Sequence, residues 1–219
     1  MLALILSLSL GPLFAVAFYS FMKYRFTKGY FGLLFRSYFY GFLSTVLAAL
    51  FFYMAYAKGY TELKNLRRIL FYSFFLIGFG QEIAKFIVLR YVILPSKLFK
   101  SPSDGISYSL MIFFGSVSAI NLAVYLFLPD PNYEILISNI VVGIVYAVIM
   151  GFFVGMGKAR NNRLIDSLTG LFGASFFHGS YEFILQTQDK MLIWPFLMGS
   201  LVITLLLIIK SIHISDELS

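Results

Sequence analysis

The 219-residue sequence contains no cysteine and few charged residues. The absence of cysteine excludes disulfide bonds, cysteine-ligated zinc sites and thiol nucleophiles. Only 12% of the residues are charged, about half the share in a typical soluble domain, whereas 60% are hydrophobic. The net charge of +7 comes from short basic clusters between long apolar runs, so it indicates membrane topology rather than nucleic-acid binding. These features indicate a polytopic membrane protein.

Seven apolar runs are long enough to cross a bilayer, which takes roughly 17–25 residues. They are Leu2–Met22, Phe31–Ala57, Ile69–Leu94, Ile106–Leu128, Ile135–Met156, Ser167–Leu185 and Leu192–Ile209. The segments between them are too short for a soluble domain, and only helices satisfy their own backbone groups in lipid over such lengths. We therefore predict an all-α transmembrane bundle of about seven spans, forming a single domain over residues 1–219.

Basic residues are unevenly distributed between alternate loops. Loops one, three and five and the C-terminal tail carry Lys23, Arg25, Lys28, Lys97, Lys100, Lys158, Arg160, Arg163 and Lys210, whereas loops two, four and six carry Lys58, Lys64, Arg67, Arg68 and Lys190. Lysine and arginine accumulate in cytoplasmic loops. The excess therefore predicts an external N-terminus and a cytoplasmic C-terminus, although the basic second loop, KGYTELKNLRR, opposes this assignment.

Three polar residues lie near the middle of predicted spans. They are Glu82 in the third span, Asn121 in the fourth and His178 in the sixth. A charged side chain at the centre of a transmembrane helix costs about 2.5–3.5 kcal/mol on the insertion scale, so such residues face the bundle interior and often mark functional sites. We predict that these three spans converge on one buried polar site.

Helical spacing brings further polar residues to the same faces. Lys85 follows Gln81 by four residues and Glu82 by three, and Glu182 follows His178 by four, so each pair shares a helix face. A purely structural interpretation is equally open here. In that interpretation Glu82–Lys85 and His178–Glu182 are neutralised intrahelical pairs, and the asparagine forms a hydrogen bond between helices.

Five short segments within residues 80–183 also follow one another in the order of a known set of motifs. They are Gln81–Lys85 (QEIAK), Asp104–Tyr108 (DGISY), Ile120–Asn121, Met150–Gly155 (MGFFVG) and His178–Glu182 (HGSYE). In this order they resemble the EExxK, DG(I)xYG, Glu-Asn, MGxxxG-like and HGxYD motifs of the PrsW family of intramembrane proteases, which is related to the CAAX prenyl endopeptidases. The motif-bearing core is then about residues 69–185.

The chain departs from these motifs at four positions. Gln81 replaces the first glutamate of EExxK, Ile120 replaces the glutamate of the Glu-Asn pair, and Gly143 stands where the family has a histidine. Glu182 stands where the family has aspartate. Because glutamine cannot accept a proton, Glu82 would serve as the catalytic acid only if it faced the reacting water, and it lies about 100° around the helix from Gln81.

The resemblance implies hydrolysis of a membrane-embedded or membrane-anchored protein, by a water that a glutamate activates or that a metal binds. It makes Glu82, His178 and Asn121 the candidate catalytic residues, and it gives supporting roles to Gln81, Lys85, Asp104 and Glu182. Glu82 and His178 would be the ligands of a divalent metal such as zinc, but a catalytic zinc commonly has three protein ligands, so a metal-free mechanism stays open.

The resemblance also implies a location and partners. We expect a multi-pass protein of the bacterial or archaeal cell membrane whose partners are the lipid bilayer and a protein substrate, with no nucleic acid.

Two accounts fit the altered motifs, and a third does not need the resemblance. In the first account the chain is a non-catalytic relative that binds membrane segments or a partner. In the second account it is an active peptidase that uses Glu82 and His178, with Asn121 as oxyanion donor. In the third account Glu82 and His178 form the proton relay of a transporter. A Glu82–His178 distance of roughly 3–5 Å, with a metal or water bridging the two side chains and a path to lipid or water, would support an active site. A separation beyond about 8 Å, or a cavity filled by Ile120 and neighbouring aromatic side chains, would exclude it.

Overall fold

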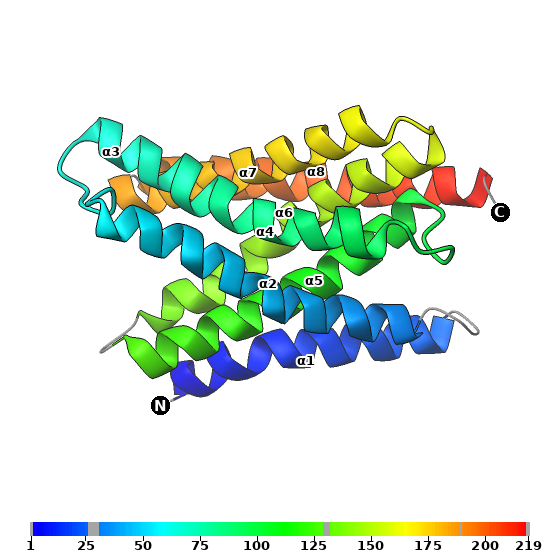
Figure 1. Ribbon diagram of the computed structural model, residues 1–219, viewed down its shortest axis with the longest axis horizontal. Coiled ribbons are helices and arrows are strands. Elements are labelled where there is room, and N and C mark those ends of the chain that lie inside the picture. The colour runs from blue at the N-terminus through cyan, green and yellow to red at the C-terminus, as the bar shows by residue number, and fades with distance from the viewer. Residues whose placement is uncertain (1, 26–30, 129–131, 189, 218–219) are drawn as a thin grey trace.

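The computed structural model describes residues 2–25, 31–128, 132–188 and 190–217. All regular secondary structure in these ranges is helical, which confirms the predicted all-α class. The long helices run roughly along the longest axis of the molecule (Figure 1). Six of them are continuous α-helices: α1 Leu2–Arg25, α2 Phe31–Ala57, α5 Pro102–Phe127, α6 Tyr133–Ala159, α7 Arg163–Thr187 and α8 Lys190–Glu217. The remaining long helix lies between α2 and α5 and has four segments.

Each predicted span corresponds to one of these helices, with ends that differ by at most four residues except in α8, which ends eight residues beyond the predicted Ile209. Within the described residues, six helices are long and apolar enough to cross a membrane, and α7 is not among them. α7 carries Asp166, His178 and Glu182 within its length, and it packs against α6 and the third long helix. α5 and α6 form the centre of the bundle, whereas α1, α2 and α8 expose most of their apolar side chains.

α1 begins and α8 ends at opposite ends of the bundle (Figure 1). Which end faces the cytoplasm stays a prediction. Lys28, one of the basic residues on which that prediction depends, lies outside the described residues.

The third long helix changes its winding on both sides of the QEIAK motif. It consists of α3 (Leu66–Leu70), the π-helical η1 (Phe71–Phe79), α4 (Gly80–Ile87) and the π-helical η2 (Val88–Ile93). The Asn65 side chain caps its start by accepting a hydrogen bond of 3.0 Å from the backbone N–H of Arg68. π-helical turns are rare and occur frequently at functional sites. The motif on α4 therefore lies between two irregular turns within one spanning helix.

Two glycines allow η1 to approach α7 closely beside this motif. A Cβ atom at Gly78 would lie 2.7 Å from the carbonyl oxygen of Ser175, and a Cβ at Gly179 would lie 2.8 Å from the Cα of Phe74. Because neither position carries a side chain, the two backbones come into direct contact. This contact sets α4 next to the part of α7 that carries His178.

Gly151 serves the contact between α6 and α5, which gives a prediction for stability. A Cβ at this position would lie 2.5 Å from the carbonyl oxygen of Gly105 and 2.7 Å from the Cα of Ile106. Because backbone atoms cannot move aside as a side chain can, we expect Gly151→Ala to lower the free energy of unfolding by about 1–3 kcal/mol. Denaturant titration of the protein in detergent micelles measures this change.

The matched control is Gly199→Ala on α8, where nothing lies within 4 Å of the added Cβ. Alanine favours the helix more than glycine does, by about 1 kcal/mol, so the control variant should be as stable as the original chain or more stable. Equal unfolding curves for the two variants would contradict the assigned packing of α5 against α6.

Candidate functional site

Glu82 is the centre of a buried cluster of charged and polar groups. Its Oε1 atom lies 2.5 Å from Lys85 Nζ and 2.7 Å from His178 Nδ1. The exposed fractions of the three side chains are only 1%, 8% and 13% in that order. A buried carboxylate requires charged or hydrogen-bonding partners of this kind. The structure therefore brings Glu82 and His178 into direct contact, at a distance too short for a bridging atom.

The structural interpretation of the sequence required two intrahelical pairs, and only one of them forms. Lys85 pairs with Glu82 within α4. Glu182 instead accepts a hydrogen bond of 2.6 Å from Gln186 Nε2, one turn further along α7. Because His178 contacts Glu82 rather than Glu182, the Glu82 carboxylate links α4 to α7 in addition to pairing with Lys85 on its own helix.

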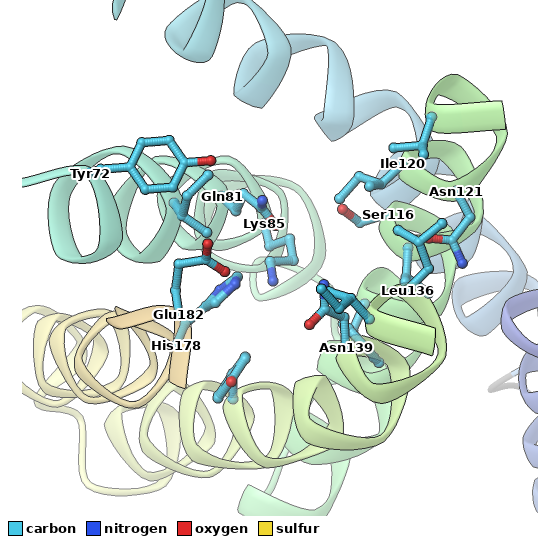
Figure 2. Close-up of a pocket in the computed structure, with 16 residues that line it drawn as sticks. Tyr72, Gln81, Lys85, Ser116, Ile120, Asn121, Leu136, Asn139, His178 and Glu182 are labelled. Atoms are coloured by element: carbon cyan, nitrogen blue, oxygen red, sulfur yellow. The ribbon is translucent and has the colours of Figure 1, made fainter. Parts of the chain in front are cut away.

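A cavity of about 250 Å³ lies beside the cluster (Figure 2). Its lining residues come from η1, α4, α5, α6 and α7. Figure 2 shows two facing walls, with Gln81, Lys85, His178 and Glu182 on one side and Ser116, Ile120, Asn121, Leu136 and Asn139 on the other. The predicted convergence of the third, fourth and sixth spans is thus present, and α6 joins them.

Gln81 lines this cavity, whereas Glu82 does not. The two residues point in different directions around α4, as their spacing of about 100° requires. The motif position that faces the cavity is therefore an amide, which can donate and accept hydrogen bonds but cannot accept a proton. Glu82 lies behind the wall and reaches the cavity only through Lys85 and His178, which both line it.

Asn121 forms the hydrogen bond between helices that the structural interpretation predicted, and Asp104 caps a helix. Asn121 lines the cavity, and its Nδ2 donates a hydrogen bond of 2.6 Å to the backbone carbonyl of Ser7 on α1. Asp104 does not line the cavity. Its Oδ2 accepts backbone hydrogen bonds from Lys100 and Ser101, and it forms a capping box with Ser101 at the start of α5. Asp104 is thus placed to fix the beginning of that helix.

α6 contributes residues that the sequence reasoning missed. Tyr146 and Asn139 line the cavity, and the Tyr146 ring stacks on the His178 imidazole with centroids 4.6 Å apart and planes 14° from parallel. Both residues lie in a long apolar run with no charged neighbour near Tyr146, so hydropathy alone does not distinguish the cavity-facing side of α6. The signals in the sequence are the polar groups themselves, the Asn139 amide and the Tyr146 hydroxyl within an apolar run.

The environment of Gly143 explains why no side chain is present there. A Cβ at this position would lie 2.2 Å from ring carbons of Phe113 on α5. The Phe113 ring also lies below the Lys85 ammonium, with Nζ 5.6 Å from the ring centroid. An aromatic ring from α5 therefore occupies the space that a side chain at position 143 would need.

The donor set around Glu82 does not fit a zinc ion. Two ligands of one tetrahedral zinc lie roughly 3.3–3.5 Å apart, given metal–ligand distances of about 2.0–2.2 Å. The 2.7 Å contact between Glu82 and His178 is a direct hydrogen bond, and Lys85 is bound to the same carboxylate oxygen. No group of three histidine, aspartate or glutamate side chains in the described part of the chain could hold a metal ion.

Comparison with known proteins gives consistent results. The chain matches the sequence model of the family described as "PrsW family intramembrane metalloprotease" over residues 30–212. It is 29% identical over 198 residues to the Protease PrsW of Oceanobacillus iheyensis, covering 88% of this chain and 89% of that protein. It is 25% identical over 142 residues to the Protease PrsW of Clostridioides difficile, covering 61% and 57% of the two chains. No solved structure matches the chain significantly.

The family match covers well over half of the chain and includes all five motif segments. It therefore confirms the resemblance inferred from those segments, and with the apolar helices it identifies an integral membrane protein. The named relatives support an intramembrane peptidase function. The family description also fits a possible metal, which contrasts with the donor set around Glu82. The chain belongs to the PrsW family of intramembrane proteases.

Proposed function

We propose that the chain is an intramembrane peptidase in which His178, held by Glu82, is the general base. The observation that carries this proposal is the 2.7 Å contact between His178 Nδ1 and Glu82 Oε1 at the edge of the cavity. An ionised carboxylate only accepts hydrogen bonds, so the hydrogen of this bond belongs to Nδ1. The other ring nitrogen, Nε2, is then unprotonated in the neutral imidazole and is free to accept a proton from water.

The reaction that this arrangement supports is ordinary peptide hydrolysis. A water oxygen attacks the carbonyl carbon of the substrate, its proton passes to His178 Nε2, and the carbonyl electron pair moves to the carbonyl oxygen. When the tetrahedral intermediate collapses, the C–N bond breaks and the imidazolium returns the proton to the leaving amine. The products are a carboxylic acid and an amine. At about 30 Å³ for each water, the 250 Å³ cavity has room for the water and part of a substrate chain.

Glu82 and Lys85 support this base without touching the substrate. Glu82 orients the imidazole and stabilises the imidazolium, as a buried carboxylate does in catalytic triads. Lys85 neutralises Glu82 when the imidazole is uncharged, so the resting site holds one compensated charge pair. Gln81 and Asn139 line the cavity and offer amide groups to a substrate backbone. The metal-free mechanism is consistent with the donor set around Glu82.

The cavity walls favour a membrane-embedded or membrane-anchored protein segment as the substrate. Ile120, Val124, Ile135 and Leu136 present apolar surface opposite the polar wall. An extended peptide lying between these walls would contact apolar side chains on one face and donate or accept hydrogen bonds on the other. A cavity with one polar and one apolar wall inside an apolar bundle is thus matched to a segment that leaves the lipid in order to react.

The experiment that tests this proposal compares the N-termini of membrane proteins in cells that lack the protein, express it, or express it with His178→Gln. We expect new N-termini within or next to transmembrane segments only with the unsubstituted protein. The unsubstituted protein and the variant should be membrane-inserted at equal levels, measured by blotting. Identical sets of N-termini in all three cell lines would refute the proposal.

A non-catalytic binding function is the second candidate, and one observation favours it. The cavity-facing position of the QEIAK motif is an amide, and the facing wall is apolar at Ile120. A photo-reactive amino acid placed at Ile120 tests it in the same cells. Capture of membrane segments by both the unsubstituted and the His178→Gln protein, without new N-termini, would favour binding over hydrolysis.

A further inference from the structure

The hydroxyl group of Tyr146 is a buried polar group with no hydrogen-bond partner among the described residues. The residue is only 3% exposed and lies on α6 within the apolar core. Leaving a buried hydroxyl unpaired costs free energy, so such groups are uncommon in folded proteins and call for an explanation. Tyr146 also lines the cavity beside His178, so a molecule in that cavity can supply the missing partner.

The ring of Tyr146 is fixed by its contact with the candidate base. It stacks on the His178 imidazole with a centroid distance of 4.6 Å and an angle of 14° between the planes. This stack holds the imidazole plane from the side of α6, while Glu82 holds Nδ1 from α4. The unpaired hydroxyl of Tyr146 is therefore held in a fixed position relative to His178, the residue that would activate water.

Three other polar groups in the cavity wall are already engaged. Lys85 Nζ is bound to Glu82, Ser116 is in contact with Thr45, and the Asn121 amide nitrogen donates to Ser7. Asn121 Oδ1 is also buried without a partner, but it is an acceptor. Among the described cavity-lining residues, Tyr146 is thus the buried side chain whose donor is unpaired.

We propose that the Tyr146 hydroxyl donates a hydrogen bond to the carbonyl oxygen of the peptide bond that is cleaved. This role rests on the proposed peptidase function. As water adds to the carbonyl carbon, negative charge develops on that oxygen, and a donor already oriented toward it stabilises the charge. Tyr146 keeps its own proton throughout, and no bond to it forms or breaks. Tyr146 is then a catalytic residue, and its ring is a positioning element for His178.

The test uses Tyr146→Phe, which removes the hydroxyl and keeps the ring, and Tyr146→Leu, which removes both. The probe is a synthetic peptide that spans the most strongly cleaved site found by N-terminal proteomics, incorporated with the purified protein in liposomes. We expect Tyr146→Phe to lower kcat about 100-fold with little change in KM, the effect of losing one oxyanion donor. Tyr146→Leu should lower it further and shift the imidazole NMR signals of His178, which Tyr146→Phe should leave in place.

Two controls separate this role from a structural one. Tyr38→Phe makes the same change at a residue whose hydroxyl bonds to Ser118 and which does not line the cavity, and it should leave kcat within about twofold of the original. Because Tyr146→Phe removes an unpaired hydroxyl, its unfolding midpoint should be unchanged or higher. A lower midpoint would mean that the hydroxyl has a structural partner, which would overturn the proposal.

The remaining outcomes are distinguishable. If the unsubstituted protein cleaves the probe and Tyr146→Phe matches it within twofold, the role of Tyr146 is wrong and the peptidase function stands. If the unsubstituted protein generates no new N-termini in cells and cleaves no peptide, the peptidase function is wrong and the role of Tyr146 is wrong with it.

Discussion

Replacing Glu82 with leucine is expected to lower the free energy of unfolding by about 3–5 kcal/mol, because Lys85 then remains buried without its counter-charge. Lys85 is 8% exposed, and its Nζ lies 2.5 Å from the carboxylate that the substitution removes. His178 also loses the acceptor for its Nδ1 hydrogen. The change is measured by denaturant titration of the protein in micelles, followed by circular dichroism and tryptophan fluorescence.

A second substitution separates folding from chemistry. In Glu82→Leu with Lys85→Met, no buried charge is left unpaired, and apolar replacements of buried ion pairs are often neutral or stabilising. We therefore expect most of the lost stability to return while cleavage stays absent. The control is Glu62→Gln, which disrupts an equally short but exposed contact with Lys64 and should barely alter unfolding. Full stability of Glu82→Leu alone would contradict the assigned role of the pair.

Replacing His178 with glutamine is expected to abolish most catalysis while leaving the fold intact. Loss of a general base lowers the rate by about 10²–10⁴-fold. The glutamine amide can still donate to Glu82, so the carboxylate keeps a partner and the unfolding midpoint should change little. Cleavage of a reconstituted peptide substrate gives the rate. A variant that retains more than a tenth of the original rate would contradict the assignment of His178 as the base.

The position of the imidazole proton can be observed directly because the chain has only two histidines. The other, His213, is 77% exposed near the end of α8, and His213→Gln leaves His178 as the only imidazole. Nitrogen-15 NMR of histidine-labelled protein should show the neutral ring with its proton on Nδ1. A proton on Nε2 would contradict the mechanism, since the ring would then direct a lone pair at a carboxylate.

The helices were predictable from the sequence because length and hydropathy determine them locally. Phe31–Ala57 has the same bounds in the sequence and the structure, since the basic stretch KYRFTKGY precedes the apolar run in the sequence and a polar segment follows it. The π-helical segments on either side of α4 were not predictable. Whether a turn in a continuous apolar run closes after four or five residues depends on packing, here on the contact between Gly78 and α7.

The candidate site was predictable in its main members and not in its arrangement. Glu82 and His178 were conspicuous because polar groups are costly at the middle of a span. Helical spacing also allowed Glu82 to pair only with Lys85 and His178 to pair with Glu182. Glu82 and His178 contact each other instead because of how α4 and α7 are rotated about their axes. The same rotations determine three further features. Gln81 faces the cavity, Tyr146 stacks on the imidazole, and Phe113 fills the space beside Gly143.

The hydrogen bond from Asn121 to Ser7 means that the working unit is larger than the region recognised by family comparison. That region begins at residue 30, whereas Ser7 belongs to α1, Leu2–Arg25. α1 also fits tightly against α5, since a Cβ at Gly11 would lie 2.6 Å from Ser118 Oγ. A minimal version built only from residues 30–212 would expose this wall of the cavity to lipid. Transplanting the site into another membrane protein would likewise require a substitute for the first helix.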